Sequence, residues 1–174
     1  MSIFKRLFGK SDIINEKSRE KKIDIEELLF SENINNSIVE LDYYICELCD
    51  WGEKPDNLTN EQKNFFFNQN LEREINNGGF NQYFSNSSGD FAHETIKSLK
   101  IIGADKTATI LQQAIDQFPD KIVPKNRTER QEILEKIEET ANEIFEDLDQ
   151  KFLVYEDDLN TLNIEFVRQN KNKF

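Results

Sequence analysis

The most distinctive stretch of the 174-residue chain reads Glu74-Ile-Asn-Asn-Gly-Gly-Phe-Asn-Gln-Tyr-Phe-Ser-Asn-Ser-Ser-Gly89. It places five amide side chains, three aromatic side chains and an adjacent pair of glycines close together. The pair Gly78-Gly79 predicts a break between two helices, because glycine readily adopts the positive φ angles that end a helix. Amides beside aromatics could bind a ligand, or they could satisfy the unpaired backbone groups at two helix ends. A turn this tight must satisfy its own backbone, which favours the structural interpretation.

Apolar residues recur three or four positions apart on both sides of this break, which is the spacing of a buried helix face. Thr59 and Gln62 have the spacing of a capping box at the start of the preceding helix. The sequence contains neither a strand-like alternation nor an internal repeat. It therefore predicts an all-α, single-domain bundle of about seven helices without a significant β-sheet. The predicted helices cover residues 34–50, 60–77, 80–84, 90–103, 105–117, 128–152 and 157–169.

The composition excludes several classes of protein. The chain has 34 acidic and 22 basic residues, and its formal net charge is -12. A general nucleic-acid binder needs an excess of Lys and Arg to neutralise phosphates, so that class is excluded. No apolar run approaches the roughly 18 residues of a membrane span, and no signal-peptide pattern is present. Two Cys and one His exclude a disulfide scaffold and a metal site built from several His.

The charge is distributed unevenly along the chain. Residues 1–22 carry seven basic and three acidic side chains, a net charge of +4, so the remainder carries -16. We therefore divide the chain into a basic leader, residues 1–22, and an acidic all-α domain, residues 23–174. Residues 1–10 place four apolar side chains at helical spacing beside cations, which leaves open a weak contact with an anionic membrane. A mobile leader or a helix at the periphery of the domain is the interpretation we prefer.

Two sets of residues could in principle carry chemistry. Cys46-Glu-Leu-Cys49 has the spacing of a redox or zinc motif, but it lies near the predicted C-terminal end of a helix, where the dipole disfavours a thiolate. A zinc site would need two more ligands, and His93 is the only other soft candidate. His93 has no recognisable nucleophile or orienting partner. The sequence predicts no catalytic residue, no metal site and no cofactor.

The glycine-rich stretch resembles the signature of a bacterial all-α family, that of the neisserial DNA-mimic protein, catalogued as a domain of unknown function. The resemblance continues through Ile102-Gly103-Ala104, Phe118-Pro119 and Leu148-Asp149, and it covers roughly residues 35–174. It implies the all-α fold and a dimeric, acidic protein that occupies the DNA-binding face of a transcription factor. The signature residues are Glu74, Asn77, Gly78, Gly79, Phe80, Gln82, Phe84, Asn86 and Gly89.

The long helix predicted from Thr128 offers a line of glutamates. Side chains three or four residues apart lie about 5–6 Å apart at Cβ, which suits the imitation of successive phosphates. Like charges so placed cost about 0.2–0.5 kcal/mol per pair, and only Arg130 and Lys136 lie nearby to relieve them. We expect this line to face solvent and to bind a partner. The glutamates are Glu132, Glu135, Glu139, Glu143 and Glu146, beside an apolar stripe of Ile133, Ile137, Ala141, Ile144, Leu148 and Phe152.

These observations lead to one functional interpretation and two alternatives. We interpret the chain as a non-enzymatic, cytoplasmic interaction protein, a DNA mimic that binds a basic protein such as a DNA-binding regulator and does not itself bind nucleic acid. An immunity-type protein that neutralises a basic toxin or nuclease would need the same acidic surface. An uncharacterised enzyme is a weaker alternative, and a homodimer is left open.

Overall fold

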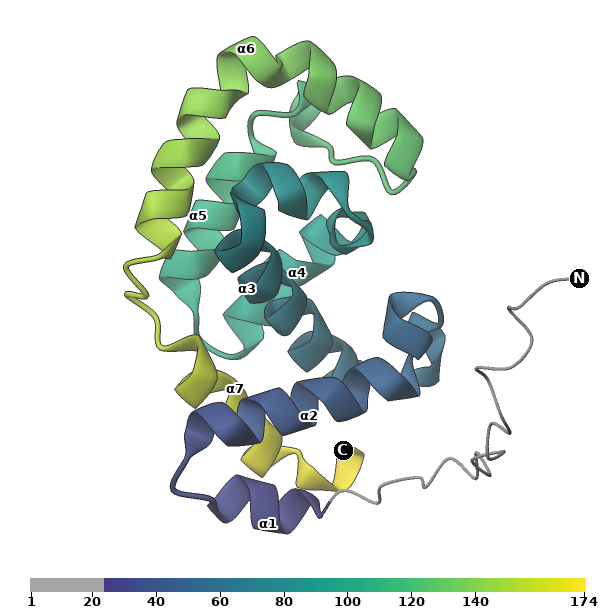
Figure 1. Ribbon diagram of the computed structural model, residues 1–174, viewed down its shortest axis with the longest axis vertical. Coiled ribbons are helices and arrows are strands. Elements are labelled where there is room, and N and C mark those ends of the chain that lie inside the picture. The colour runs from purple at the N-terminus through teal and green to yellow at the C-terminus, as the bar shows by residue number, and fades with distance from the viewer. Residues whose placement is uncertain (1–23) are drawn as a thin grey trace, which may run out of the picture.

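The computed structural model describes residues 24–174, which form seven α-helices and no strand (Figure 1). The all-α prediction is therefore confirmed. The basic leader and the membrane contact predicted for residues 1–10 lie outside the described residues. The helices are α1 (Ile25–Phe30), α2 (Ile34–Leu48), α3 (Asn60–Ser85), α4 (Ala92–Ile101), α5 (Asp105–Ile115), α6 (Arg127–Phe152) and α7 (Leu159–Gln169). Short 3₁₀ turns join them at Asp50–Gly52 (η2), Pro55–Asn57 (η3), Ser87–Phe91 (η4) and Pro119–Lys121 (η5), and Lys171–Lys173 (η6) follows α7.

Helix α3 runs through the middle of the molecule and packs against α2, α4, α6 and α7 (Figure 1). It begins with the predicted capping box: Gln62 N donates to Thr59 Oγ1 at 3.1 Å, and Thr59 N donates to Gln62 Oε1 at 2.9 Å. The predicted break at Gly78-Gly79 is a kink within α3, since both residues have non-helical dihedral angles. The predicted break between two helices is therefore confirmed: α3 consists of two helical segments joined at this kink.

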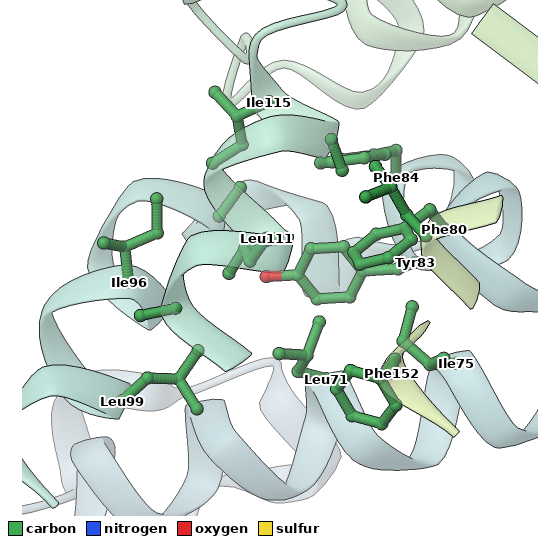
Figure 2. Close-up of a cluster of buried hydrophobic side chains, with 14 of the residues drawn as sticks. Leu71, Ile75, Phe80, Tyr83, Phe84, Ile96, Leu99, Leu111, Ile115 and Phe152 are labelled. Carbon is green, nitrogen blue, oxygen red and sulfur yellow. The ribbon is translucent and has the colours of Figure 1, made fainter. Parts of the chain in front are cut away.

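The first half of α3 packs in one hydrophobic cluster with α1, α2 and α7. The second half packs in a larger cluster with α4, α5 and α6. Figure 2 shows Tyr83 of α3 in this larger cluster, with Leu71 and Leu111 beside its ring. The Tyr83 hydroxyl group is paired with Thr95 Oγ1 at 3.1 Å, so the buried ring leaves no polar atom unsatisfied. This cluster holds α6 against the kinked end of α3.

Three details of the predicted helices are wrong. Helix α1 was not predicted, because its six residues are too few to show a period. Helix α4 begins at Ala92, two residues after the predicted start at Asp90, and no side chain caps it. Ile144 does not belong to the buried stripe: it is 39% exposed, and the adjacent Phe145 is buried in its place. The ring of Phe145 packs on those of Phe80 and Phe84, with centroids 6.3 and 5.7 Å apart.

Candidate functional site

The five glutamates of the candidate partner-binding line are all exposed on α6. At 100° per residue they fall within about 80° of one another around the helix axis. The buried residues Ala141, Phe145 and Leu148 lie on the opposite side, against α3 and α5. Figure 1 shows α6 as a long, curved helix along one edge of the molecule. We call the surface of Glu132, Glu135, Glu139, Glu143 and Glu146 the acidic face.

The cations of α6 do little to neutralise this face. Arg130, which we expected to relieve the repulsion, is fully buried and is paired with Asp90. Arg127 donates to Ser85 O at the end of α3, and Lys151 pairs with Asp147. Lys136 makes no ion pair with any residue between 24 and 174. The acidic face therefore keeps most of its negative charge.

One end of the acidic face is tied to the kinked half of α3. Asn142 Nδ2 donates to Glu146 Oε1 at 3.1 Å, and Asn81 Nδ2 donates to Asn142 Oδ1 at 2.9 Å. Beside Glu143 and Glu146 there is a hollow of about 390 Å³, to which Asp147 also contributes. A basic side chain of a partner would meet several carboxylates there.

The kink in α3 depends on a carboxylate from α6. Gly79 has a φ of +72°, and a Cβ atom at this position would lie 2.0 Å from Asp149 Oδ2. Asp149 Oδ1 accepts a hydrogen bond from Phe80 N at 2.8 Å. Asp149 thus caps the second half of α3, although it lies 69 residues away in the sequence. Burial raises the pKa of Asp149 above its ordinary value of 3.8.

Glu74 organises the polar residues of the signature. Its carboxylate accepts hydrogen bonds from Gln82 Nε2 at 2.6 Å, from Asn86 Nδ2 at 2.9 Å and from Ser88 Oγ at 2.9 Å. A Cβ atom on Gly78 would lie 2.3 Å from Gln82 Oε1, so this glycine makes room for the Gln82 side chain. The Gln82 and Asn86 amides therefore donate to the Glu74 carboxylate across the kink, and not to the unpaired backbone groups that the structural interpretation assigned to them.

Arg130 completes the signature, and sequence reasoning missed this role. Its guanidinium group donates to the backbone oxygens of Phe84 and Asn86 at the end of α3, and to that of Pro124. It also pairs with Asp90 at 2.7 Å. A Cβ atom on Gly89 would lie 2.7 Å from Arg130 Nε, which explains the glycine. The only signal in the sequence is an Arg among acidic residues, which is more often an exposed residue.

The side chains of three signature residues make no polar contact in this network. Phe80 and Phe84 are fully buried and stack on each other, with their centroids 6.0 Å apart. Asn77 is exposed beside the kink. The signature residues together form the kink and the end of α3. No hydrogen bond joins any of these signature residues to a glutamate of the acidic face; the adjacent Asn81 reaches Glu146 through Asn142.

The two cysteines and the histidine that were considered as chemically active residues lie on different helices, the cysteines at the end of α2 and His93 on α4. Cys46 and Cys49 are free thiols, both buried at the C-terminal end of α2. Burial and the nearby Asp42 raise the pKa of Cys46 to about 12, and burial also raises that of Cys49, which disfavours a reactive thiolate. His93 Nε2 accepts a hydrogen bond from Val123 N at 3.1 Å.

Within residues 24–174, no group of three or more His, Cys, Asp or Glu side chains is arranged to hold a metal ion. Over the same residues, none of the helices combines the length and the apolar composition needed to cross a membrane.

One comparison with known proteins gives a match. A family model described as DMP19-like protein matches residues 56–170. The match contains the kinked α3, with its glycine pair, and α6, with its acidic face. No curated protein and no solved structure matches the chain.

Proposed function

The chain belongs to the DMP19-like protein family, and from this premise we propose that it is a non-enzymatic DNA mimic that blocks the DNA-binding surface of a regulatory protein. The observation that carries the proposal is the acidic face of α6. Its five exposed glutamates lie opposite the core, in a chain with a net charge of -12. A regulator that works on DNA in the cytoplasm presents the basic surface that such a face would bind.

The dimensions of the acidic face suit a short length of DNA strand. From Glu132 to Glu146 the helix rises by about 21 Å, at 1.5 Å per residue. One strand of duplex DNA presents about six phosphates over that length. The helix offers five carboxylates, and each is carried on a flexible side chain that can adjust its position. The spacing therefore allows most of the phosphate contacts of a basic groove-binding surface to be imitated.

The test reverses two charges at the middle of the acidic face. A binding partner is first captured from the native host, and its affinity is then measured for the full chain and for the variant Glu135→Lys/Glu139→Lys. We expect the variant to bind about 100-fold more weakly or worse, because two attractive contacts become repulsive. Affinity of the unchanged chain should fall steeply with added salt, since the Debye length is about 8 Å at physiological ionic strength.

The matched control is Glu32→Lys/Glu165→Lys. Both residues are exposed, Glu32 between α1 and α2 and Glu165 on α7, so this variant has the same net charge but an intact acidic face. It should bind within about threefold of the original chain, since only long-range attraction changes. Equal losses in both variants would contradict a specific role for α6. So would full binding by Glu135→Lys/Glu139→Lys with an unchanged melting temperature.

Competition with DNA separates mimicry from an immunity-type function. If duplex DNA displaces the chain from its partner, and the partner contacts DNA with the same surface, mimicry is supported. A partner that never binds DNA, and whose toxic or nuclease activity is blocked by the chain, would instead favour the immunity-type alternative. The mass of the free chain in solution tests the predicted homodimer in the same experiments.

A further inference from the structure

A second polar site is lined by residues outside the acidic face. A cavity of about 410 Å³ opens between the η2–η3 segment, the first half of α3 and the η4 turn. Asn70, Arg73 and Glu74 of α3 line it, together with Trp51 and Glu53 of the η2–η3 segment. None of these residues belongs to the acidic face of α6.

The charges in this cavity leave an excess of carboxylate. Arg73 donates to both oxygens of Asp42 through Nη2, at 2.9 and 2.8 Å, so its charge is balanced from outside the cavity. Asp90, which also lines the cavity, is balanced by the buried Arg130. Glu53 and Glu74 make no ion pair with any described residue. The cavity therefore favours a positively charged occupant.

The cavity also contains groups that recognise a cation by shape and hydrogen bonding. The Asn70 side chain is half-buried and has no hydrogen-bond partner among residues 24–174, so its amide oxygen is free to accept. Trp51 is 60% exposed at the cavity, and Phe66 and Phe91 also line the wall. An aromatic ring attracts a guanidinium or ammonium group over its face, most strongly when the ring is indole.

The turn that carries Trp51 holds an uncommon backbone conformation. Asp50 and Trp51 have φ angles of +53° and +57°, in the left-handed region that non-glycine residues seldom adopt. The turn is held by an ion pair between Lys54 and Asp50 and by an edge-to-face contact between Trp51 and Tyr43. Such a conformation costs about 1–3 kcal/mol per residue and persists only where surrounding contacts impose it. Here it places Trp51 in the wall of the cavity that Glu53 and Glu74 also line.

We propose that this cavity binds a guanidinium or primary ammonium group. Glu53 and Glu74 supply the negative charge, the Asn70 oxygen accepts a hydrogen bond, and Trp51 covers the flat face of the cation. The same chemistry has two sources: an Arg or Lys side chain of a protein partner, or a small free amine. The wall formed by α3 and η4 lies within the family match, whereas Trp51 and Glu53 precede it, so the family match covers only part of this site.

The first experiment follows Trp51, the one tryptophan of the chain, by fluorescence. The full chain is titrated with N-acetyl-arginine amide and with its neutral isostere N-acetyl-citrulline amide in about 0.15 M salt, which suppresses loose ion binding. We expect a saturable change with the arginine compound and at least about tenfold weaker binding of the citrulline compound. Equal affinity for the two compounds would overturn the cation assignment.

The second experiment locates the site. In amide NMR spectra, the arginine compound should shift the Trp51 indole and Asn70 side-chain signals. Shifts confined to α6 would mean that the compound only coats the acidic face, and would overturn the proposal. Titration of a blocked Gly-Gly-Arg-Gly-Gly peptide and of agmatine then distinguishes the sources. Tighter binding of the peptide identifies a partner's side chain, and tighter binding of agmatine identifies a free amine.

A matched pair of variants separates the effect of the cavity carboxylate from effects of net charge or of altered folding. Glu53→Gln removes an exposed carboxylate at the cavity, and Glu32→Gln removes one elsewhere. Glu53→Gln should weaken binding of the arginine compound about fivefold, and Glu32→Gln less than twofold. Equal effects would overturn the site. The Glu135→Lys/Glu139→Lys variant should bind the compound as before, so this proposal and the DNA-mimic proposal can fail separately.

Discussion

At the scale of single residues, the two adjacent glycines of the signature have different tasks. Gly79 adopts a positive φ and lets the Asp149 carboxylate approach the backbone of the kink. Gly78 has an extended φ of -167°, and it is needed because the Gln82 side chain occupies the space of its Cβ atom. Gly79 is thus needed both for its backbone conformation and for the close approach of Asp149, whereas Gly78 is needed only for the close approach of Gln82.

The variant Gly79→Ala tests the contact with Asp149. Gly79 has a φ of 72° and a ψ of -168°, a conformation almost confined to glycine, so alanine costs about 1–3 kcal/mol there. Displacement of the carboxylate would add about 1–3 kcal/mol by leaving Phe80 N–H unpaired. Urea unfolding should therefore show a loss of about 2–6 kcal/mol in the free energy of unfolding. Gly103→Ala is the control, because Gly103 has a φ of +81° with no atom within 4 Å of its Cβ position. Equal losses in the two variants would contradict the role given to Asp149.

Substitution of Arg130 is expected to destabilise the fold strongly. Arg130 is fully buried, and it links the end of α3 to the start of α6 and to Asp90. Arg130→Lys keeps a charge but cannot reach the same acceptors, so unfolding should become easier by about 3–5 kcal/mol. The neighbouring Arg127 is exposed, and Arg127→Lys should cost less than about 1 kcal/mol. Thermal unfolding measures the stability of both variants. If Arg130→Lys destabilises the protein no more than Arg127→Lys, Arg130 does not have this linking role.

At the scale of one element, α6 has an exposed, charged face and a buried, apolar face. Its outer face carries the glutamates, and its inner face must pack on α3 and α5. The sequence pattern alone allows either Ile144 or Phe145 at the inner face, since they are adjacent and both apolar. The rings of Phe80 and Phe84 decide for Phe145, which fills the space between α3 and α6.

Truncation of each side chain tests which of the two is buried. Phe145→Ala should lower the free energy of unfolding by about 3–5 kcal/mol, because it leaves a cavity in the larger hydrophobic cluster. Ile144→Ala should cost less than about 1 kcal/mol, since that side chain is 39% exposed. Chemical denaturation followed by circular dichroism measures both. The reverse order would mean that α6 is rotated relative to α3.

At the scale of the whole molecule, burial of carboxylates predicts a stability maximum in mild acid. Burial raises the pKa of Asp42, Glu72 and Asp149 above ordinary values of 3.8, 4.5 and 3.8. A raised folded-state pKa contributes stability that is fully present below the ordinary value and is lost as pH rises through the folded value. Asp116 behaves in the opposite way, because hydrogen bonds from Gln112 and Lys121 lower its pKa. The stability that Asp116 contributes is present above its ordinary pKa and is lost only when the pH falls through the lowered value.

The melting temperature should therefore fall by about 2–4 °C as the pH rises from about 4, near the ordinary pKa values of these carboxyl groups, toward 8. The excess of negative charge acts in the same direction, because protonation relieves repulsion in a chain of net charge -12. Asp149→Asn removes one of the titrating groups and should flatten the profile. A melting temperature that rises steadily from pH 5 to pH 8 would contradict this account.

Short-range patterns in the sequence predict most of the helices. The spacing of apolar residues, the capping box of Thr59 and Gln62, and the glycine pair are signals carried by residues close together in the chain. The resemblance of the glycine-rich stretch to the DNA-mimic family is likewise confirmed by the family match. The acidic line of α6 was also predicted to be exposed from the helix period alone, and all five glutamates are exposed. Whether they bind a partner stays a prediction.

By itself, then, the sequence determined the all-α class, the place of the kink and the acidic character of the chain, because helix periodicity, glycine conformation and charge depend only on neighbouring residues or on composition. The tertiary structure alone decided that Asp149 caps Phe80, that Arg130 holds the end of α3, and that Trp51 and Glu74 line one cavity. In a chain with 34 acidic side chains, no local pattern distinguishes those that are to be buried. Burial is decided when segments about 40–70 residues apart pack together and must satisfy one another's backbone groups.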